Sequence, residues 1–474
     1  MKQPHQKFRL QVLVITILFT FTFKINAQPP LIEQWESNMT TWGEHWGLYL
    51  TDLYPDSGTF NEQNMTYYDG QRVFYQIAEY TGQQEPWYNN AQEAKRIYLN
   101  YVANRINNWS GLDYSIPGYR RFSHGLYMDW VRVNSPGIME SIIKIRDNPA
   151  FSNPEQWGYD NPNQTWYWSN YSREVAYALS SHIMAERAGN PRNEIRVPIY
   201  IDMVLNHINE WVTGNRGNPD TTRHRFAPFM VGLTAEALID YYEWEVEQGH
   251  NPDNTIPDTL KQLADYMWTA TVYDGMNQGE PMWIADIGGT GYPYNDQGGT
   301  GVGAFRYEDR ENPISAIDGT GLLSPELNLL IAPLYAWVFK HFGDITYIER
   351  GDLIWEGGVD LSNVGWNTKI YNQNYRWSFK YVEWRKEGDA ILSVGDENKN
   401  EIQTYPNPVN DKLTINSLTQ PIESYKIYTT KGQLVQSDSL VNINQINIAS
   451  LTSGIYLLEF IANQEKVAIK FIKE

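Results

Sequence analysis

Helical patterns recur through most of this chain and constrain its fold more than any other feature. Each pattern spaces apolar side chains three or four residues apart, as on the buried face of a helix, and together they cover residues 68–80, 86–106, 170–187, 197–212, 226–244, 259–271, 325–342 and 370–384. The predicted helices follow one another in pairs, without the strand–helix alternation that is typical of a parallel sheet.

Paired helices bury their apolar faces well in a closed ring of helical hairpins, an (α/α) toroid. The competing architecture, a linear helical solenoid, would be indicated by a fixed-period repeat, which we do not find. We therefore expect a mainly α protein, with an incomplete helical barrel over residues 28–386 and its site in the central cavity, lined by loops and helix starts.

The pattern changes after residue 386. Residues 387–403 are polar and charged, which predicts a linker. From 404 to 474, short alternating β-rich runs are separated by turn pairs such as Asn-Pro, Lys-Gly and Ser-Gly. We expect a small β-sandwich there.

Three stretches of this last region carry a more specific resemblance: YPNP near its start, the strand pair YKIYTTKGQLV, and LTSGIYLLEF before a basic end. They resemble the C-terminal sorting domain of proteins exported by the bacterial type IX secretion system. The resemblance implies passage through the outer membrane, followed by release or surface attachment, and it makes the secretion machinery a partner of this chain.

The first residues predict a secretory signal peptide. Lys2, Lys7 and Arg9 precede an apolar run that ends at Phe23, and Ala27 offers a small residue at a cleavage point. We expect residues 1–27 to be removed. A membrane anchor is the alternative, although the apolar run is short for a span.

Composition excludes several classes of chemistry. The chain has no cysteine, which excludes disulfides, thiolate catalysis and zinc–thiolate sites. Its 56 acidic and 37 basic residues give a formal charge of −19, which argues against nucleic-acid binding but not against an anionic substrate held by local arginines. No metal-binding motif appears, so we expect no required cofactor; a structural calcium held by loop oxygens stays open. We expect a monomer.

Aromatic side chains are unusually frequent, with 18 Trp, 33 Tyr and 16 Phe. A ring-rich core is one interpretation. The other is carbohydrate binding, because several tryptophans fall in polar segments predicted to be loops, where rings stack on sugar faces. These are Trp35, Trp42, Trp46, Trp157, Trp166 and Trp168.

A basic triplet, Arg223-His224-Arg225, stands just before the helix predicted from residue 226. Free N–H groups and partial positive charge at a helix start favour an anion, and a histidine there titrates near neutrality. The triplet therefore predicts a site for an acidic sugar. The alternative is a solvated basic turn of no functional weight.

Other loop-to-helix junctions offer similar side chains. One junction supplies Asn170, Tyr171 and Arg173, and a second supplies Arg120, Arg121, His124 and Tyr127. A third supplies Tyr371, Asn374, Tyr375 and Arg376. A glycine-rich segment from 273 to 322 is predicted to form a lid or wall, carrying Tyr292, Tyr294, Arg306 and Tyr307. Each junction alone is also typical of a helix cap or a core ring.

In this arrangement the region 28–386 looks like the (α/α)-toroid polysaccharide lyases, those acting on alginate and glucuronan above all. Such enzymes cleave uronate polymers by β-elimination. The resemblance implies Asn170 and His224 as neutralisers of the substrate carboxylate, with Arg225 assisting, and Tyr292 as base or acid, with Tyr375 as the second choice. The residues expected to bind substrate are Arg173, Arg223, Arg225, Arg306, Arg376, His124, Trp46 and Trp168.

Two other functions stay open. A glycoside hydrolase on the same fold would need two carboxylates, for which Asp69, Asp129, Asp286 and Asp318 are available. Asp286 is the best candidate for the acid, whereas Asp69 is better explained as a helix cap. A non-catalytic glycan-binding protein of the cell surface is the third interpretation.

Overall fold

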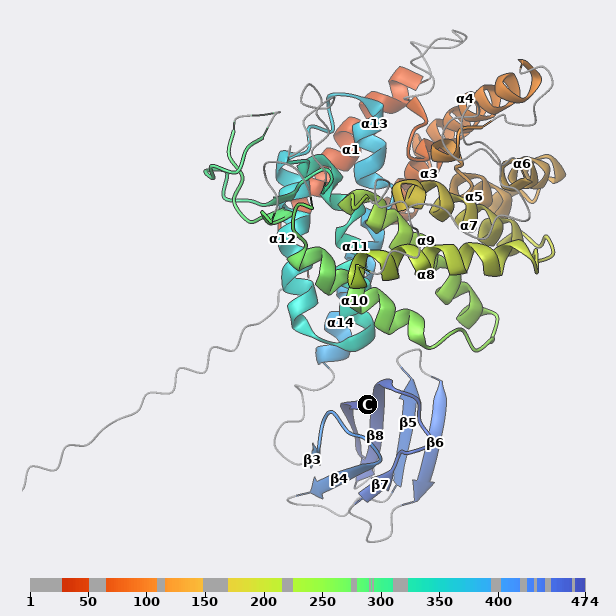
Figure 1. The fold of residues 1–474 in the computed structure, drawn as a ribbon. Coiled ribbons are helices and arrows are strands. Elements are labelled where there is room, and N and C mark those ends of the chain that lie inside the picture. The colour runs from red at the N-terminus through yellow and green to blue at the C-terminus, as the bar shows by residue number, and fades with distance from the viewer. Residues whose placement is uncertain are drawn as a thin grey trace, which may run out of the picture.

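A computed structural model describes residues 28–50, 65–108, 116–147, 169–214, 225–273, 279–289, 291, 294–309, 323–393, 402–417, 424–429, 433–439, 445–462 and 465–473. The predicted signal peptide lies outside these residues. The chain is mostly helical up to residue 393 and forms β-sheets after 402 (Figure 1), as predicted at this coarse level.

The helical region contains long helices joined by turns and short 3₁₀ segments (Figure 1). The helices are α1 (Ile32–Leu48), α3 (Gly70–Thr81), α4 (Trp87–Asn108), α5 (His124–Val133), α6 (Pro136–Asp147), α7 (Ser172–Arg187), α8 (Arg196–Thr213), α9 (Pro228–Glu247), α10 (Thr255–Thr269), α11 (Ala332–Phe342), α12 (Ile345–Leu361), α13 (Thr368–Tyr375) and α14 (Ser378–Ser393). The 3₁₀ segments are η2 (Gly118–Arg120), η3 (Ser169–Tyr171) and η5 (Pro325–Leu330).

Helices that follow one another along the chain also pack side by side. α3 contacts α4 and α5, α7 contacts α8 and α9, and α11 contacts α12 and α14. α13 packs against both α1 and α3, so the end of the helical region meets its beginning. Segments far apart in sequence thereby come together around one interior.

Local sequence signals explain several helix ends. The Asp69 side chain accepts a hydrogen bond from the Arg72 amide at 3.2 Å and caps α3, and Gly82 ends the helix in the left-handed conformation with φ 68°. Pro228 is the first residue of α9. Gly343 ends α11 in the left-handed conformation, as Gly82 ends α3. The segment predicted as one helix over 325–342 divides into η5 and α11.

The core is dominated by aromatic rings. The largest fully buried side chains include Trp35, Trp87, Trp211, Trp337, Trp355 and Trp377. Trp35, Trp42 and Trp46 lie on helix α1 and not in a loop, so the prediction of loop tryptophans is wrong for these three. Trp157, Trp166 and Trp168 lie outside the described residues.

The glycine-rich segment forms a small antiparallel pair, β1 (Trp283–Ile284) with β2 (Ala304–Phe305). Its isolated bridges include Tyr294 with Leu323 and Gly288 with Asn295. The segment is therefore anchored at several points in the described part, as a wall requires.

The C-terminal region contains two antiparallel sheets (Figure 1). One has the order β3-β4-β7 and the other β6-β5-β8-β9. Leu413, Ile446, Ile427 and Leu458, from both sheets, belong to a single apolar cluster. The strands are β3 (Ile402–Tyr405), β4 (Lys412–Ser417), β5 (Ser424–Thr429), β6 (Leu434–Ser439), β7 (Gln445–Asn447), β8 (Gly454–Ala462) and β9 (Glu465–Lys473).

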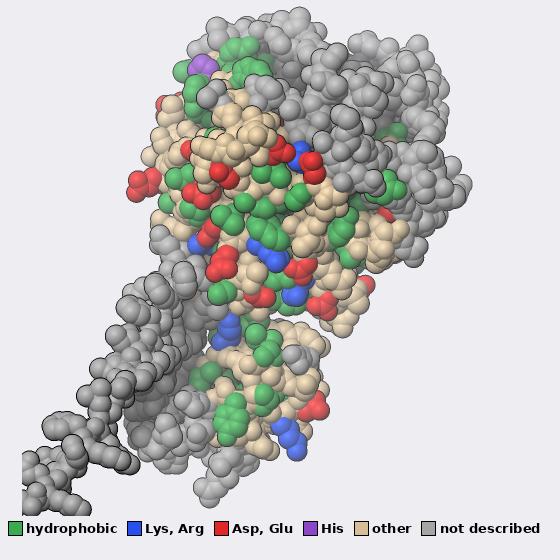
Figure 2. All heavy atoms as spheres, turned by 60° about the vertical axis from the view of Figure 1, so that its left-hand side comes forward, with side chains coloured by type: hydrophobic (Ala, Val, Ile, Leu, Met, Phe, Trp, Pro, Cys, Tyr) green, Lys and Arg blue, Asp and Glu red, His purple; other side chains and the backbone are tan. Residues whose placement is uncertain are grey.

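Two further observations bear on the predicted organisation. Helix α14 continues to Ser393, so the first part of the predicted linker 387–403 is helical. Within the described residues, none of the helices has the length and apolar character needed to cross a membrane. On the face shown in Figure 2, acidic and basic side chains are interspersed among apolar ones.

Candidate functional site

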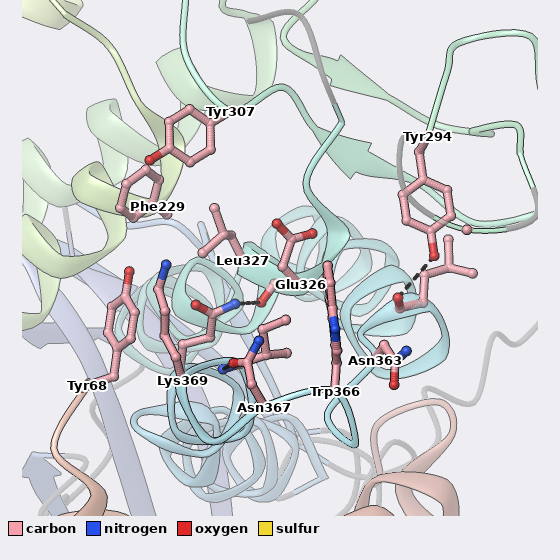
Figure 3. A pocket seen from close by; sticks show the side chains of 14 residues that line it. Tyr68, Phe229, Tyr294, Tyr307, Glu326, Leu327, Asn363, Trp366, Asn367 and Lys369 are labelled. Atoms are coloured by element: carbon pink, nitrogen blue, oxygen red, sulfur yellow. Dashed lines mark hydrogen bonds between the residues drawn. The ribbon is translucent and has the colours of Figure 1, made fainter. Parts of the chain in front are cut away.

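A cavity of about 560 Å³ opens where several helix starts meet the glycine-rich segment (Figure 3). Its walls come from the turn before α3, the start of α9, η5, the turn between α12 and α13, and α13 itself. The lining residues are Tyr68, Phe229, Gly291, Tyr294, Tyr307, Glu326, Leu327, Leu361, Asn363, Trp366, Asn367, Lys369, Ile370 and Gln373.

Tyr68 is held in the cavity wall by an uncommon backbone conformation. Tyr68 and Asp69 both have positive φ, 63° and 66°, which is rare for residues other than glycine. The Asp69 carboxylate stabilises this turn, since it caps α3 and also accepts a hydrogen bond from the Gly125 amide at 3.0 Å. Strain of this kind is found most often at functional positions. Burial raises the pKa of Tyr68 well above its usual value, so this phenol keeps its proton.

Lys369 lies in the first turn of α13 and provides positive charge. In Figure 3 its amine and the Tyr68 hydroxyl point to the same side of the cavity. Its Nζ lies 5.6 Å from the centre of the Tyr67 ring, and the Arg120 guanidinium lies 4.6 Å from the same ring. Burial lowers the pKa of Lys369, and the charges of Arg173 and Arg120 lower it further, whereas Glu326 opposes this effect.

Glu326 in η5 is a half-buried carboxylate near the middle of the cavity (Figure 3). Burial raises its pKa to about 7, with Lys369 opposing the shift. The Gln373 side chain donates a hydrogen bond to the Glu326 carbonyl oxygen at 2.9 Å, which fixes η5 against α13. A carboxyl group that titrates near neutrality can give or take a proton at physiological pH.

The rim of the cavity is aromatic and neutral. The Trp366 side chain is 62% exposed, and the Tyr294 hydroxyl donates a hydrogen bond to the Leu361 carbonyl oxygen at 3.2 Å. Asn363 and Asn367 complete this edge. Exposed rings beside amides suit a sugar, which presents both apolar C–H faces and hydroxyl groups.

Some predicted residues lie at or near this cavity. Tyr294 and Tyr307 of the glycine-rich segment line it. Arg225 is ion-paired with Glu308, and its guanidinium lies 5.9 Å from the centre of the Tyr307 ring. It is close to the wall without being one of the described lining residues.

Asn170 and Arg173 are not among the described residues that line the cavity. The Asn170 Oδ1 atom is buried without a hydrogen-bond partner among the described residues. Arg173 is paired with Glu174 at 2.6 Å and lies 5.3 Å from the centre of the Tyr119 ring. Its charge lowers the pKa of Tyr67, although burial raises that pKa more strongly, so Arg173 contributes to the positive side of the site.

Four predicted residues do not line the cavity, because their polar groups are bonded elsewhere. They are Tyr375, Trp46, Arg376 and Arg306. The Tyr375 hydroxyl donates to the Trp35 carbonyl oxygen at 2.9 Å, and the Trp46 indole donates to that of Val364 at 3.0 Å. Two arginines are also committed: Arg376 pairs with Glu236 at 3.0 Å, and Arg306 pairs with Glu280 at 2.8 Å and with Asp296 at 3.1 Å. Apolar periodicity and salt bridging explain these positions better than substrate contact does. Arg223, His224 and Tyr292 lie outside the described residues.

His124 belongs to a different cavity, of about 460 Å³, lined by residues of α3, α5, α7, α9, α11 and α14. Its Nε2 atom lies 2.7 Å from a carboxylate oxygen of Asp240. His124, Glu236 and Asp240 have potential metal-ligand atoms within 4.8 Å of one another. However, Glu236 is already paired with Arg72 and Arg376, and two guanidinium groups at this point disfavour a cation.

Of the carboxylates considered for a hydrolase, the three that the structure describes do not line the cavity. Asp286 accepts hydrogen bonds from the Gly299 and Gly301 amides at 2.9 and 2.8 Å, and these bonds lower its pKa. Asp129 accepts a hydrogen bond from Lys95 at 2.8 Å, and Asp69 is the cap described above. Asp318 lies outside the described residues. Sequence analysis missed Glu326, because an acid in the first turn of a helix is ordinarily a favourable partner of the helix dipole.

Comparison with known proteins identifies the C-terminal region alone. No curated protein and no solved structure matches this chain. Residues 403–474 match the family model described as the secretion system C-terminal sorting domain, which agrees with the resemblance to type IX sorting domains. The sorting domain indicates that the protein is exported, and that it is secreted or attached to the cell surface.

Proposed function

We propose that the protein is a polysaccharide lyase that cleaves a uronate-containing polymer by β-elimination in the cavity beside Tyr68. The observation that carries the proposal is the meeting of three groups there: a cation, Lys369; a carboxyl group with a pKa of about 7, Glu326; and a protonated phenol, Tyr68. Elimination from a uronate needs a group that neutralises the substrate carboxylate, a base that takes the C5 proton and an acid that protonates the leaving oxygen. These three groups can supply the three roles.

In this mechanism Lys369 binds the substrate carboxylate and withdraws charge from it, so that the proton on C5 becomes more acidic. The ionised Glu326 carboxylate takes that proton. The C5 electron pair forms the C4–C5 double bond, the bond from C4 to the glycosidic oxygen breaks, and Tyr68 gives its proton to the departing oxygen. No oxidant or reductant is consumed.

We also propose that the helical region is an incomplete (α/α) toroid. The packing of α13 against α1 and α3 supports ring closure, and the cavity lies where helix starts converge. Arg223, His224 and Tyr292, which lie outside the described residues, stay predicted site residues, as do Asn170 and Arg225. The alginate and glucuronan lyases remain the families that the sequence resembles.

A glycoside hydrolase is the second candidate, since Glu326 would also serve as a general acid at neutral pH. A second carboxylate is needed on the opposite side of the scissile bond. Among the described lining residues, Glu326 is the only carboxylate. This composition favours the lyase, and surface glycan binding without catalysis is the third alternative.

The test is ultraviolet absorbance during incubation of the exported protein with alginate, glucuronan, pectate and glycosaminoglycans. Elimination creates a conjugated double bond and hydrolysis does not. Glu326 as a base must be ionised, so lyase activity should rise as pH increases through about 7; Glu326 as a general acid must be protonated, so hydrolase activity should fall. New reducing ends without absorbance would replace the lyase by the hydrolase, and retention on a glycan column without either product would favour binding alone.

A further inference from the structure

The turn between α12 and α13 is held unusually firmly for a surface segment. The Val364 carbonyl accepts the Trp46 indole N–H at 3.0 Å. Gly365 lies against the Trp42 ring, so closely that a Cβ atom there would be 2.4 Å from it. Asn367 caps α13, since its side chain accepts a hydrogen bond from the Ile370 amide at 2.9 Å. Trp42 and Trp46 of α1 thus pack against this turn and stabilise it.

Trp366 projects from this turn with 62% of its side chain exposed. Its indole combines an apolar face with a polar N–H group, and on a rigid support at a cavity wall it is available to a ligand. In Figure 3 the ring is seen edge-on, between the Glu326 carboxylate and Asn363, where it forms one wall of the cavity. A fixed ring beside amide groups is suited to stacking on a sugar face.

The charges around Trp366 differ from those around Lys369. Glu326 lies between the two residues in Figure 3. Burial raises the pKa of Tyr294 near this rim, and the negative charges of Glu326 and Asp360 raise it further. Among the described lining residues, Lys369 is the only cation. A second carboxylate on the substrate would therefore meet repulsion on the Trp366 side.

We propose that Trp366, with Asn363 and Asn367, forms a subsite for an uncharged sugar next to the uronate subsite at Lys369. The substrate class that follows is a polysaccharide in which a uronate alternates with an uncharged sugar, in contrast to the all-uronate polymers. This assignment rests on the proposed elimination and sharpens its substrate.

The matched probes are hyaluronan, in which glucuronate alternates with N-acetylglucosamine, and glucuronan, which contains glucuronate alone. Binding is measured by affinity electrophoresis of the full chain, and cleavage by ultraviolet absorbance. Trp366→Ala should weaken retardation by hyaluronan and raise KM for it about tenfold, with kcat nearly unchanged. Trp366→Phe should restore most of the affinity. Leu353→Ala is the control, because Leu353 is 46% exposed on α12 and is not a lining residue.

Preference for hyaluronan that is lost in Trp366→Ala and kept in Leu353→Ala supports the subsite. Equal or tighter binding of glucuronan, or unchanged hyaluronan binding in Trp366→Ala, overturns it. The binding arm also separates the two proposals. Trp366-dependent retardation by hyaluronan without any absorbance product would retain the subsite and reject the elimination. Absorbance from glucuronan that is indifferent to Trp366 would retain the elimination and reject the subsite.

Discussion

Two cavities lined by described residues of the helical region differ in how their charged groups are arranged. Phe229 lines the first cavity and Asp240 the second, and both lie on α9, which separates them by roughly 16 Å at the rise of an α-helix. In the second cavity the charges are paired with one another: His124 with Asp240, Arg132 with Glu79, Arg187 with Glu247, and Lys380 with Glu383.

The first cavity lacks such pairing. In the described part of the chain, neither the Glu326 carboxylate nor the Lys369 ammonium forms an ion pair, although each influences the pKa of the other. Glu326 is half-buried and Lys369 is exposed, and groups with shifted pKa values are found most often at functional sites. The unpaired groups therefore support the proposed chemistry in the first cavity, whereas the ion pairs of the second cavity are explained by a structural role.

Between the cavities, Glu236 is buried with two arginines. Arg376 and Arg72 lower its pKa, although burial opposes them. In this triad the buried Glu236 carboxylate forms ion pairs with both arginines. Glu326 is half-buried without an ion pair among the described residues and Glu236 is buried in two ion pairs, and variants of these two carboxylates test the difference.

The largest expected effect is on activity. Glu326→Gln removes the group that takes the C5 proton, so the rate of elimination should fall by about 10²–10⁴-fold, measured by ultraviolet absorbance on the best polymer of the panel. Circular dichroism should show an intact fold. Glu383→Gln is the matched control, because that carboxylate is exposed and paired with Lys380. Comparable activity of Glu326→Gln and the control would remove Glu326 from the mechanism.

The next effect is on stability and concerns Glu236. Glu236→Gln leaves Arg72 and Arg376 buried without a counter-charge, which should cost about 3–5 kcal/mol of unfolding free energy. Urea denaturation monitored by fluorescence measures it. The exposed Lys380–Glu383 pair should be worth at most about 1 kcal/mol. A Glu236 variant as stable as Glu383→Gln would mean that the triad does not hold the interior.

The third prediction uses pH. The pKa of Glu326 is raised from 4.5 to about 7 in the folded chain, so the folded state binds this proton more tightly than the unfolded state does. The resulting penalty is absent below the unfolded pKa and complete above about 7, where it amounts to roughly 3 kcal/mol. Glu326→Gln should therefore gain stability over the wild type as pH rises from 5 to 8. A constant difference across this range would mean that the Glu326 pKa is not raised.

Sequence patterns predicted much of the helical region, but the predicted ranges did not include α1, α5, α6 and α12. α1 and α12 carry glycines that would ordinarily argue against a helix. In the fold these glycines allow close packing: a Cβ at Gly47 would lie 2.0 Å from the Asn90 side chain, and one at Gly357 would lie 1.9 Å from the Gly303 carbonyl oxygen. Periodicity cannot distinguish a glycine that breaks a helix from one that admits a neighbour.

The site was predicted less well than the fold. The glycine-rich segment was expected to be a lid or wall carrying Tyr292, Tyr294, Arg306 and Tyr307. Tyr294 and Tyr307 line the cavity, Arg306 is paired with Glu280 and Asp296, and Tyr292 lies outside the described residues. Tyr68, Glu326, Lys369 and Trp366 were missed, because each lies at an ordinary helix start or turn. Their place in the proposed site comes from the meeting of distant segments, which cannot be read from local sequence.

The smallest expected effect belongs to Asp286, the carboxylate that sequence alone favoured for a hydrolase. Its side chain accepts hydrogen bonds from the Gly299 and Gly301 amides, and the lowered pKa keeps it ionised at neutral pH. Such a group shapes a loop and makes a poor general acid. Asp286→Asn keeps an acceptor oxygen for these amides, so activity on the best polymer should stay within about twofold of the wild type across pH 5–8. A large loss across this pH range would instead bring Asp286 into the chemistry and revive the two-carboxylate mechanism, with Glu326 as its partner.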